Sequence, residues 1–454
     1  MREALQAMGL DKMDPAMVRQ MQAQVQAMMS GTDDGPINVD LAHDTARGAV
    51  TQQGDDASIG ENTRRDVAQV VQVANLWLDA VTDFSPPEGN GVALSRAEWV
   101  EQTLPVWRSL TTPVAEGVRA ALTNAMSQQM KELGESDTPM SIPGMPAGMN
   151  PAALMGQMEP MMRKMSSAMF GAQVGQAVGT LAGEIVTGTE VGLPLLPGEQ
   201  VAILPANISK FAEGLEIDAG EVHLYLGVRE AARVRLFAGV PWLGPQLLAA
   251  VQDYARDINI DTDAIEEAVR SADTTNPQAM QEALSGSLFS PEPSAAQRTA
   301  LTRLETYLAL VEGWVDVVSE RAASKHLPHA AALSEAVRRR RATGGPAEKV
   351  FASLVGLELR PRRLRDAANL WSALEAAHGS NARDAAWDHP DLAPTAKDLD
   401  DPLGYVEARN DSSSGGPSLD DELEALLSSA DGASSDDSPE DGQTPTEPED
   451  GPNR

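Results

Sequence analysis

Residues 221–237 read EVHLYLGVREAARVRLF, and their spacing predicts a helix that is largely buried. Asp218 stands just before this stretch, where it can cap the helix. Arg229 and Arg233 are four residues apart and therefore project from one face, with Glu230 beside them. Charged side chains on so apolar a helix need partners, because buried unpaired charge is costly.

A second apolar stretch carries acids with the same spacing. Residues 308–318 read LALVEGWVDVV, and Glu312 and Asp316 are again four residues apart on one face. We expect the two helices to face each other. The acids would then meet either a metal ion or the guanidinium groups of Arg229 and Arg233.

The composition of the 454 residues excludes several classes of protein. With no cysteine, the chain has no disulfide, no catalytic thiol and no cysteine-bound metal, which fits a cytoplasmic location. A net charge of −32 repels phosphate backbones, so we expect no nucleic-acid partner. We also expect no membrane partner, because the best candidate for a membrane span, the uncharged residues 165–183, contains several Ser, Gln and Thr side chains.

Composition divides the chain into three predicted parts. Residues 1–34 read as an N-terminal helical segment, partly flexible, and residues 35–410 as a mainly α domain. A linker rich in Met, Pro and Gly interrupts this domain at about 134–150. Residues 411–454 are acidic and contain few apolar side chains, so we predict a disordered tail.

Within the domain, periodicity predicts helices joined by short breaks. Residues 31–62 read as a long loop, Pro113 as a helix break, and residues 191–204 as a short β-hairpin around Pro197. Four glycines at every fourth position of 171–183 clear one helix face for close packing. The predicted helices are 62–81, 95–111, 113–133, 161–186, 220–240, 243–257, 261–271, 293–326, 329–341, 346–355 and 361–377.

Several stretches together resemble a known family, the actinobacterial zincin-like hydrolases. This family is identified with zinc-dependent metalloproteases and is related to proteins linked with coenzyme F420 biosynthesis. The resemblance covers most of residues 35–405. The stretches that carry it are INVDLAHDTAR, ANLWLDAVTDF, SRAEWVEQTLPVWRSL, GLPLLP, EVHLYLGVREAARVRLFAGVPWL, LVEGWVDVV, GGPAEKVFASLVGLELRPRRLRDAANLW and WDHPDLAPTAKDLDDP.

The resemblance implies a zincin-like fold with a zinc site and hydrolase activity. In a zincin, His-Glu-x-x-His on a helix places two imidazoles on the metal, and the Glu takes a proton from the bound water. A later Glu-x-x-x-Asp adds a ligand and an acid that orients a ligand histidine. On this pattern Glu230 is the catalytic base, Glu312 the metal ligand and Asp316 the orienting acid.

The sequence departs from this pattern at both histidine positions, which hold Arg229 and Arg233. A guanidinium has no lone pair for a metal. A site built from Glu230, Glu312 and Asp316 alone would suit calcium or magnesium better than zinc. The alternative is an arginine–carboxylate network in place of the metal, which would make the chain a pseudoenzyme or a scaffold that binds a peptide or protein segment.

Other candidate residues leave alternatives open. His223 precedes Glu230 by two turns and could approach Glu312 if the helices cross there. His326 and His329 flank a Leu-Pro turn that could hold a metal or simply end a helix. The four arginines of 338–341 could form a basic patch for an acidic ligand or complement the dipole at a helix end.

Overall fold

The computed structural model describes residues 35–135, 151–258, 293–342, 346–357 and 363–413. These residues are mainly helical, as predicted, with a single sheet of two short strands. They belong to two compact units, which divide between Pro402 and Leu403. The predicted N-terminal segment, most of the linker and the tail from residue 414 lie outside the described residues.

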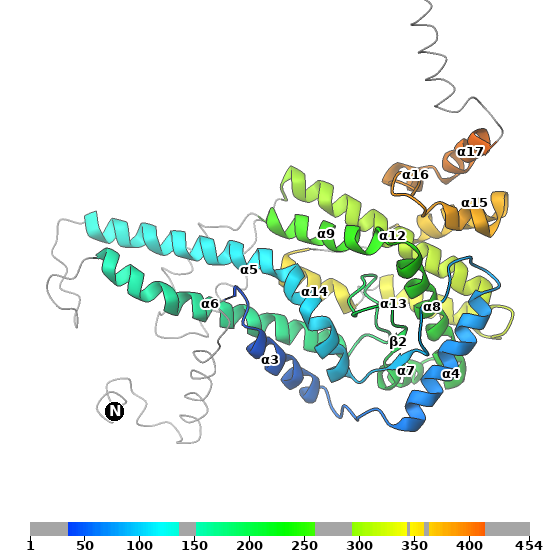
Figure 1. Ribbon diagram of the computed structural model, residues 1–454, viewed down its shortest axis with the longest axis horizontal. Helices are drawn as coiled ribbons and strands as arrows, with labels where there is room; N and C mark the ends of the chain where they lie inside the picture. Colours follow the sequence, from blue (N-terminus) through cyan, green and yellow to red (C-terminus); the bar gives the residue numbers. More distant parts are fainter. Residues whose placement is uncertain (1–34, 136–150, 259–292, 343–345, 358–362, 414–454) are drawn as a thin grey trace, which may run out of the picture. The chain divides into compact units, whose positions relative to one another are not determined.

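Most predicted helices are present with shifted ends, and helix 261–271 lies outside the described residues (Figure 1). The helices are α3 (Val39–Gln52), α4 (Glu61–Leu78), α5 (Arg96–Glu135), α6 (Pro151–Ala182), α7 (Pro205–Ala212), α8 (Ala219–Gly239), α9 (Leu243–Arg256), α12 (Ala295–Ala323), α13 (Ala330–Ala342), α14 (Pro346–Val355), α15 (Leu364–Ala385), α16 (Ala396–Asp400) and α17 (Pro402–Ser413).

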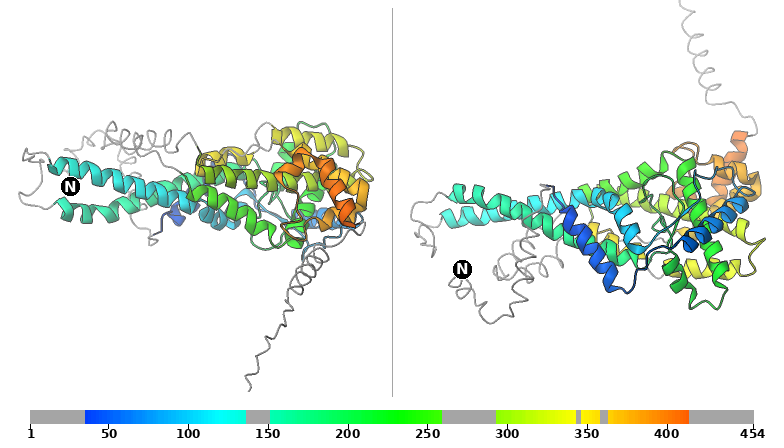
Figure 2. Two further views of the ribbon diagram at one scale, coloured as in Figure 1. Left: turned by 90° about the horizontal axis from the view of Figure 1, so that it is seen from above. Right: turned by 60° about the horizontal axis from the view of Figure 1, so that its bottom comes forward.

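Helix α6 packs closely on α3 along its row of glycines (Figure 2). A Cβ atom at Gly175 would lie 2.2 Å from the carbonyl oxygen of Ala42, and one at Gly171 would lie 2.4 Å from that of Asn38. The predicted close packing is therefore confirmed. The predicted loop over 31–62 is wrong for Val39–Gln52, which form α3, because Asn38 caps this helix with its side chain and small residues on it fill the face opposite the glycines.

Helices α8 and α12 form the centre of the first unit. Every residue of α8 from Tyr225 to Leu236 is buried, which is typical of a helix enclosed on all sides. Helix α12 contacts α8, α9 and α15. Gly313 lets α15 approach, since a Cβ there would lie 2.7 Å from Cβ of Ala367. Trp371 Nε1 donates to the carbonyl oxygen of Leu310 at 2.9 Å.

The predicted hairpin over 191–204 is wrong. Strand β2 (Ala202–Ile203) instead pairs in parallel with β1 (Val92–Ala93), which lies far away in the sequence. Pro194, in the supposed first strand, removes a backbone donor just before the predicted turn at Pro197, so that stretch turns rather than pairs. Gly188 N donates to the carbonyl oxygen of Ala202 at 2.9 Å, and this bond anchors the loop that crosses α8.

Helix α5 continues through the predicted break at Pro113. It runs as one helix with Pro105 and Pro113 inside it. An interior proline costs about 3 kcal/mol. Leu110 and Val114 are buried on either side of the break, and their packing offsets that cost.

Among the helices of the described ranges, none is by itself both long and apolar enough to cross a membrane. The pair α8 and α9 reaches the required length and composition together, but the two are bent by 91° at their junction.

Candidate functional site

The charged residues of α8 and α12 face each other, as the sequence predicts. Arg229 Nη1 lies 2.8 Å from Asp316 Oδ1, and Arg233 Nε lies 2.9 Å from Glu312 Oε1. Since the later arginine meets the earlier acid, the two helices run antiparallel. At most 10% of each of these four side chains is exposed, so the pairs are held away from water.

Glu230 is enclosed between α8 and the loop that carries Thr189. Its Oε1 accepts from Thr189 N at 2.9 Å. Its Oε2 accepts from Thr189 Oγ1 and from Arg233 Nη1, both at 2.9 Å. The side chain is 0% exposed. Both carboxylate oxygens are therefore already hydrogen-bonded inside the protein.

Helix α13 adds arginines from a third side. Arg338 Nη2 lies 2.6 Å from Asp316 Oδ2, and Arg341 Nη1 lies 3.0 Å from Glu312 Oε2. We call the resulting group the arginine–carboxylate cluster, and its members are Arg229, Glu230, Arg233, Glu312, Asp316, Arg338 and Arg341.

The rest of the four-arginine run has other partners. Arg340 Nε lies 3.1 Å from Glu190 Oε1, on the loop that encloses Glu230. Arg339 lies at the surface, 2.7 Å from Glu335. The run is therefore neither an open basic patch nor only a complement to the helix dipole, because three of its four members bind carboxylates on other elements.

Burial and charge shift the pKa values of the cluster in opposite directions. Burial alone would raise the pKa of Glu312, but three guanidinium groups outweigh it and lower the pKa to about 2. Burial keeps the pKa of Glu230 above its ordinary value, although Arg233 and Thr189 oppose this. Burial alone would lower the pKa of Arg229, but its anionic neighbours outweigh burial and raise it. The two glutamates thus have different environments within one cluster.

The cluster does not suit a metal ion. Its acids already bind guanidinium groups, which have no lone pair to share with a metal. Within the part of the chain that the structure describes, no group of three or more His, Asp or Glu side chains is arranged to hold one. The residues therefore fit neither zinc nor the oxygen-bound calcium or magnesium that the sequence left open.

The histidines lie apart from the cluster. His223 Nδ1 lies 2.8 Å from the carbonyl oxygen of Ala219 on its own helix, and the ring lines a cavity of about 430 Å³ between α4 and α8. His326 stacks on Trp77 with ring centroids 4.5 Å apart. His329 Nδ1 lies 3.2 Å from Glu221. The described contacts bring none of them together as a metal-binding pair.

Sequence reasoning missed three members of the site. Thr189 follows no recognisable pattern, because a backbone donor in a loop leaves no periodic signal. Arg338 and Arg341 did give a signal, since they are three residues apart and therefore share a helix face. What the sequence lacked was any sign that this face lies against α12 rather than water.

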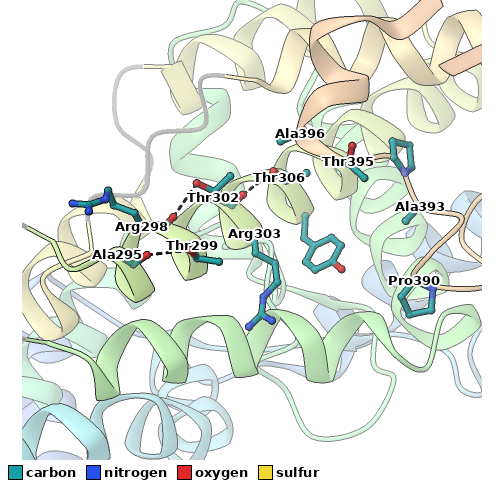
Figure 3. Close-up of a pocket in the computed structure, with 12 residues that line it drawn as sticks. Ala295, Arg298, Thr299, Thr302, Arg303, Thr306, Pro390, Ala393, Thr395 and Ala396 are labelled. Atoms are coloured by element: carbon teal, nitrogen blue, oxygen red, sulfur yellow. Dashed lines mark hydrogen bonds between the residues drawn. The ribbon is translucent and has the colours of Figure 1, made fainter. Parts of the chain in front are cut away.

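A separate groove of about 540 Å³ lies along the first half of α12, against the segment 390–396 (Figure 3). Tyr307 and Arg303 line it, and Arg303 also binds Asp253 at 2.7 Å. The threonines of α12 along it use their hydroxyl groups within the helix, as Thr302 Oγ1 does at 2.9 Å from the carbonyl oxygen of residue 298. This groove is distinct from the cluster, although both involve α12.

Comparison with known proteins agrees with this fold. A crystal structure from Chloroflexus aurantiacus, described as a candidate hydrolase with a novel fold, superposes with a TM-score of 0.55 at 16% identity. The match covers 82% of this chain and 99% of the other. No curated protein matches the sequence. The sequence pattern that defines the family of zincin-like metallopeptidases matches residues 37–406, and the chain therefore belongs to that family.

Proposed function

We propose that this chain is a family member without zinc-peptidase activity, whose fold serves to bind a peptide or protein. One observation carries the proposal. Arg229 and Arg233 stand at the two histidine positions of the zincin pattern and bind Asp316 and Glu312 at 2.8 and 2.9 Å. The charge of these arginines replaces that of a metal, and the pairs hold α8 against α12.

The environment of Glu230 supports this proposal. A general base must come within hydrogen-bonding distance of the proton that it removes. Thr189 and Arg233 already occupy both oxygens of Glu230, and the side chain is 0% exposed. A water molecule or peptide could reach it only after the loop around Thr189 moved.

The competing proposal is a working hydrolase, and membership of the family favours it. Glu230 would then be the base, Glu312 a ligand of zinc, and Asp316 the residue that orients another ligand. This proposal requires a cation to displace Arg229 and Arg233 from their carboxylates, with no imidazole to replace them.

Metal content and activity separate the two proposals. We expect protein purified without chelator to carry far less than one zinc per chain and to cleave no peptide from a mixed library. Stoichiometric zinc would overturn the pseudoenzyme proposal. Peptide hydrolysis that disappears in Glu230→Gln would establish the hydrolase, and hydrolysis that survives this substitution would show that Glu230 is not the base.

Replacement of both arginines by histidine tests whether Glu312 lies where the third zinc ligand of a zincin would lie. The double variant Arg229→His with Arg233→His should gain zinc or cobalt affinity, because Glu312 then lies within reach of two imidazoles. A matched control is Glu335→His with Arg339→His, which places an equivalent pair on the exposed face of α13. Equal metal affinity in both variants would contradict the assignment of Glu312 as a third ligand.

The partner surface is proposed to be the groove along α12, because the cluster itself is too enclosed to admit a peptide. Peptides selected from a random library on the wild-type protein should lose binding in Tyr307→Ala and keep it in Arg339→Ala. Peptides that bind both variants equally would place the partner elsewhere. A cytoplasmic location and the absence of a nucleic-acid partner remain part of this proposal.

A further inference from the structure

The arginine–carboxylate cluster is one part of a longer row of polar side chains that α8, α12 and α13 direct toward one another. We call this row the polar seam and describe it in layers, each about one helical turn from the next. Arg233, Glu312 and Arg341 form one layer, and one turn away Arg229 and Asp316 join Arg338 in the next.

Two turns beyond that second layer, Glu221 of α8 meets His329 at the start of α13, with 3.2 Å between carboxylate oxygen and Nδ1. Helices α8 and α13 therefore run parallel and in register, while α12 runs antiparallel to both.

Because the Glu221–His329 pair lies two helical turns from the layer of Arg229 and Arg338, one further layer of side chains must lie between them. Helical spacing places there Tyr225, four residues before Arg229, and Ser334, four residues before Arg338. On the antiparallel α12 the corresponding residue is Ser319, three residues after the acid of the second layer. The three hydroxyl groups thus come from three different helices.

All three hydroxyl groups are buried without a partner. The exposed fraction is 0% for Tyr225, 0% for Ser319 and 2% for Ser334, and no hydrogen bond within the described residues satisfies any of them. Some buried helical hydroxyls elsewhere bond to the preceding turn, as Thr103 Oγ1 does at 2.9 Å from the carbonyl oxygen of Trp99, whereas those of Ser166 and Ser167 on α6 have no partner among the described residues either. A buried polar group without a partner costs free energy, so three in one layer need an explanation.

The charges beside this layer are already balanced. Tyr225 lies close enough to Arg229 and Arg338 to interact with both electrostatically. Arg229 binds Asp316 and Glu312, while Arg338 binds Asp316 and lies 3.6 Å from Glu320. An anion would meet these carboxylates as well as the arginines. The layer therefore favours a neutral ligand that both donates and accepts hydrogen bonds.

We propose that Tyr225, Ser319 and Ser334 form a buried site for a small neutral hydrogen-bonding ligand, one or more water molecules. Buried water typically makes about three hydrogen bonds to polar groups that would otherwise have no partner. The ligand would complete the seam between the ionic layers and the Glu221–His329 pair, where the protein supplies no bond of its own.

The sign of three stability changes tests the proposal. Tyr225→Phe, Ser319→Ala and Ser334→Ala each remove one hydroxyl and little volume. With the site occupied, each should raise the unfolding equilibrium constant roughly fivefold to tenfold, as the loss of one net hydrogen bond does. In a dry layer, each substitution would remove an unpaired polar group, so an unchanged or more stable variant overturns the proposal. Tyr254→Phe gives the reference value for the loss of one tyrosine hydrogen bond, because the Tyr254 hydroxyl donates to the carbonyl oxygen of Gly356 at 3.1 Å.

Crystallography gives an independent measurement. At high resolution, electron density for water should bridge at least two of the three hydroxyl oxygens in the wild-type protein. A crystal soaked in bromide should show no anomalous peak there, since the site is inferred to be neutral. An empty layer, or a bromide ion bound between Tyr225 and Arg338, would overturn the proposal.

Discussion

Replacement of Arg233 by Met would remove the guanidinium group that joins both buried glutamates. Arg233 Nε lies 2.9 Å from Glu312, and its Nη1 lies 2.9 Å from Glu230. The arginine side chain is only 2% exposed, so water cannot replace these contacts. Met has a similar length and no charge, which keeps the change in packing small.

The structure indicates the size of the effect. Removal of one partner from a buried ion pair typically costs 3–5 kcal/mol, because the other charge stays buried without compensation. Glu312 would keep two cations, Arg229 and Arg341, whereas Glu230 would keep only neutral donors, the threonines Thr187 and Thr189. We therefore expect a loss of about 3–4 kcal/mol near neutral pH, with the unpaired charge of Glu230 as its main cause.

The loss should depend on pH. Burial already raises the pKa of Glu230, and removal of a neighbouring cation raises it further. A carboxyl group whose pKa is higher in the folded state than in the unfolded state stabilises the fold as pH falls. Arg233→Met should therefore recover part of its stability as the pH is lowered from about 7.5 to about 5.5.

Urea denaturation followed by circular dichroism measures this at both pH values. A shifted midpoint with an unchanged m value identifies a change of stability. The control is Arg339→Met, whose side chain is 78% exposed and which should change stability by less than about 0.5 kcal/mol. A loss below about 1 kcal/mol at neutral pH, or the same loss at both pH values, would refute the account of Arg233 and Glu230.

Three further predictions concern the packing, the acid response and a second polar network. Gly175→Ala should lower the free energy of unfolding by at least about 2 kcal/mol in urea denaturation, because the new Cβ would lie 2.2 Å from the Ala42 carbonyl oxygen. The control Gly48→Ala has open space around the new Cβ and should stabilise α3 by about 0.5–1 kcal/mol. The pKa of Glu312 is lowered to about 2, so its ionised form contributes roughly 3 kcal/mol to the free energy of unfolding at pH values above its unfolded-state pKa. This contribution should disappear as the pH falls from about 4.5 to about 2, and the variant Glu312→Gln should not show that part of the loss. Asp384→Ala should cost about 3 kcal/mol or more in the same assay, because it leaves Arg383, with 0% of its side chain exposed, without its adjacent carboxylate.

The meeting of α8 and α12 could be predicted from the sequence because charge constrains apolar helices strongly. Two arginines and two acids with the same four-residue spacing, each on an apolar helix, have few ways to avoid unpaired burial. This argument needs no knowledge of the intervening chain. It predicted that the arginines and acids of the two helices face each other but left a metal ion open as the partner of the acids, and the structure pairs Arg229 with Asp316 and Arg233 with Glu312.

Other features depend on tertiary contacts that leave no local signal. Strand β2 was recognisable as extended, but its partner is the stretch Val92–Ala93, which has only two residues in the strand. The break predicted at Pro113 follows from local preference, and the buried neighbours of that proline outweigh it. Helix α3 is rich in alanine because α6 approaches it closely, and that reason becomes visible only when the glycines of α6 are placed opposite it.

The proposed exchange of a metal for arginines is consistent in charge but not in geometry. Zinc with two neutral histidines carries a charge of +2, and two guanidinium groups carry the same charge. A guanidinium, however, is a planar fork that binds carboxylates at hydrogen-bond distances, so acids around it must stand farther apart than ligands around an ion.

The cluster follows this requirement, because Arg233 lies between Glu230 and Glu312 at 2.9 Å from each. Restored histidines alone would therefore recreate the donors without bringing the acids inward, so the zinc affinity of the double histidine variant should stay below that of a native zincin.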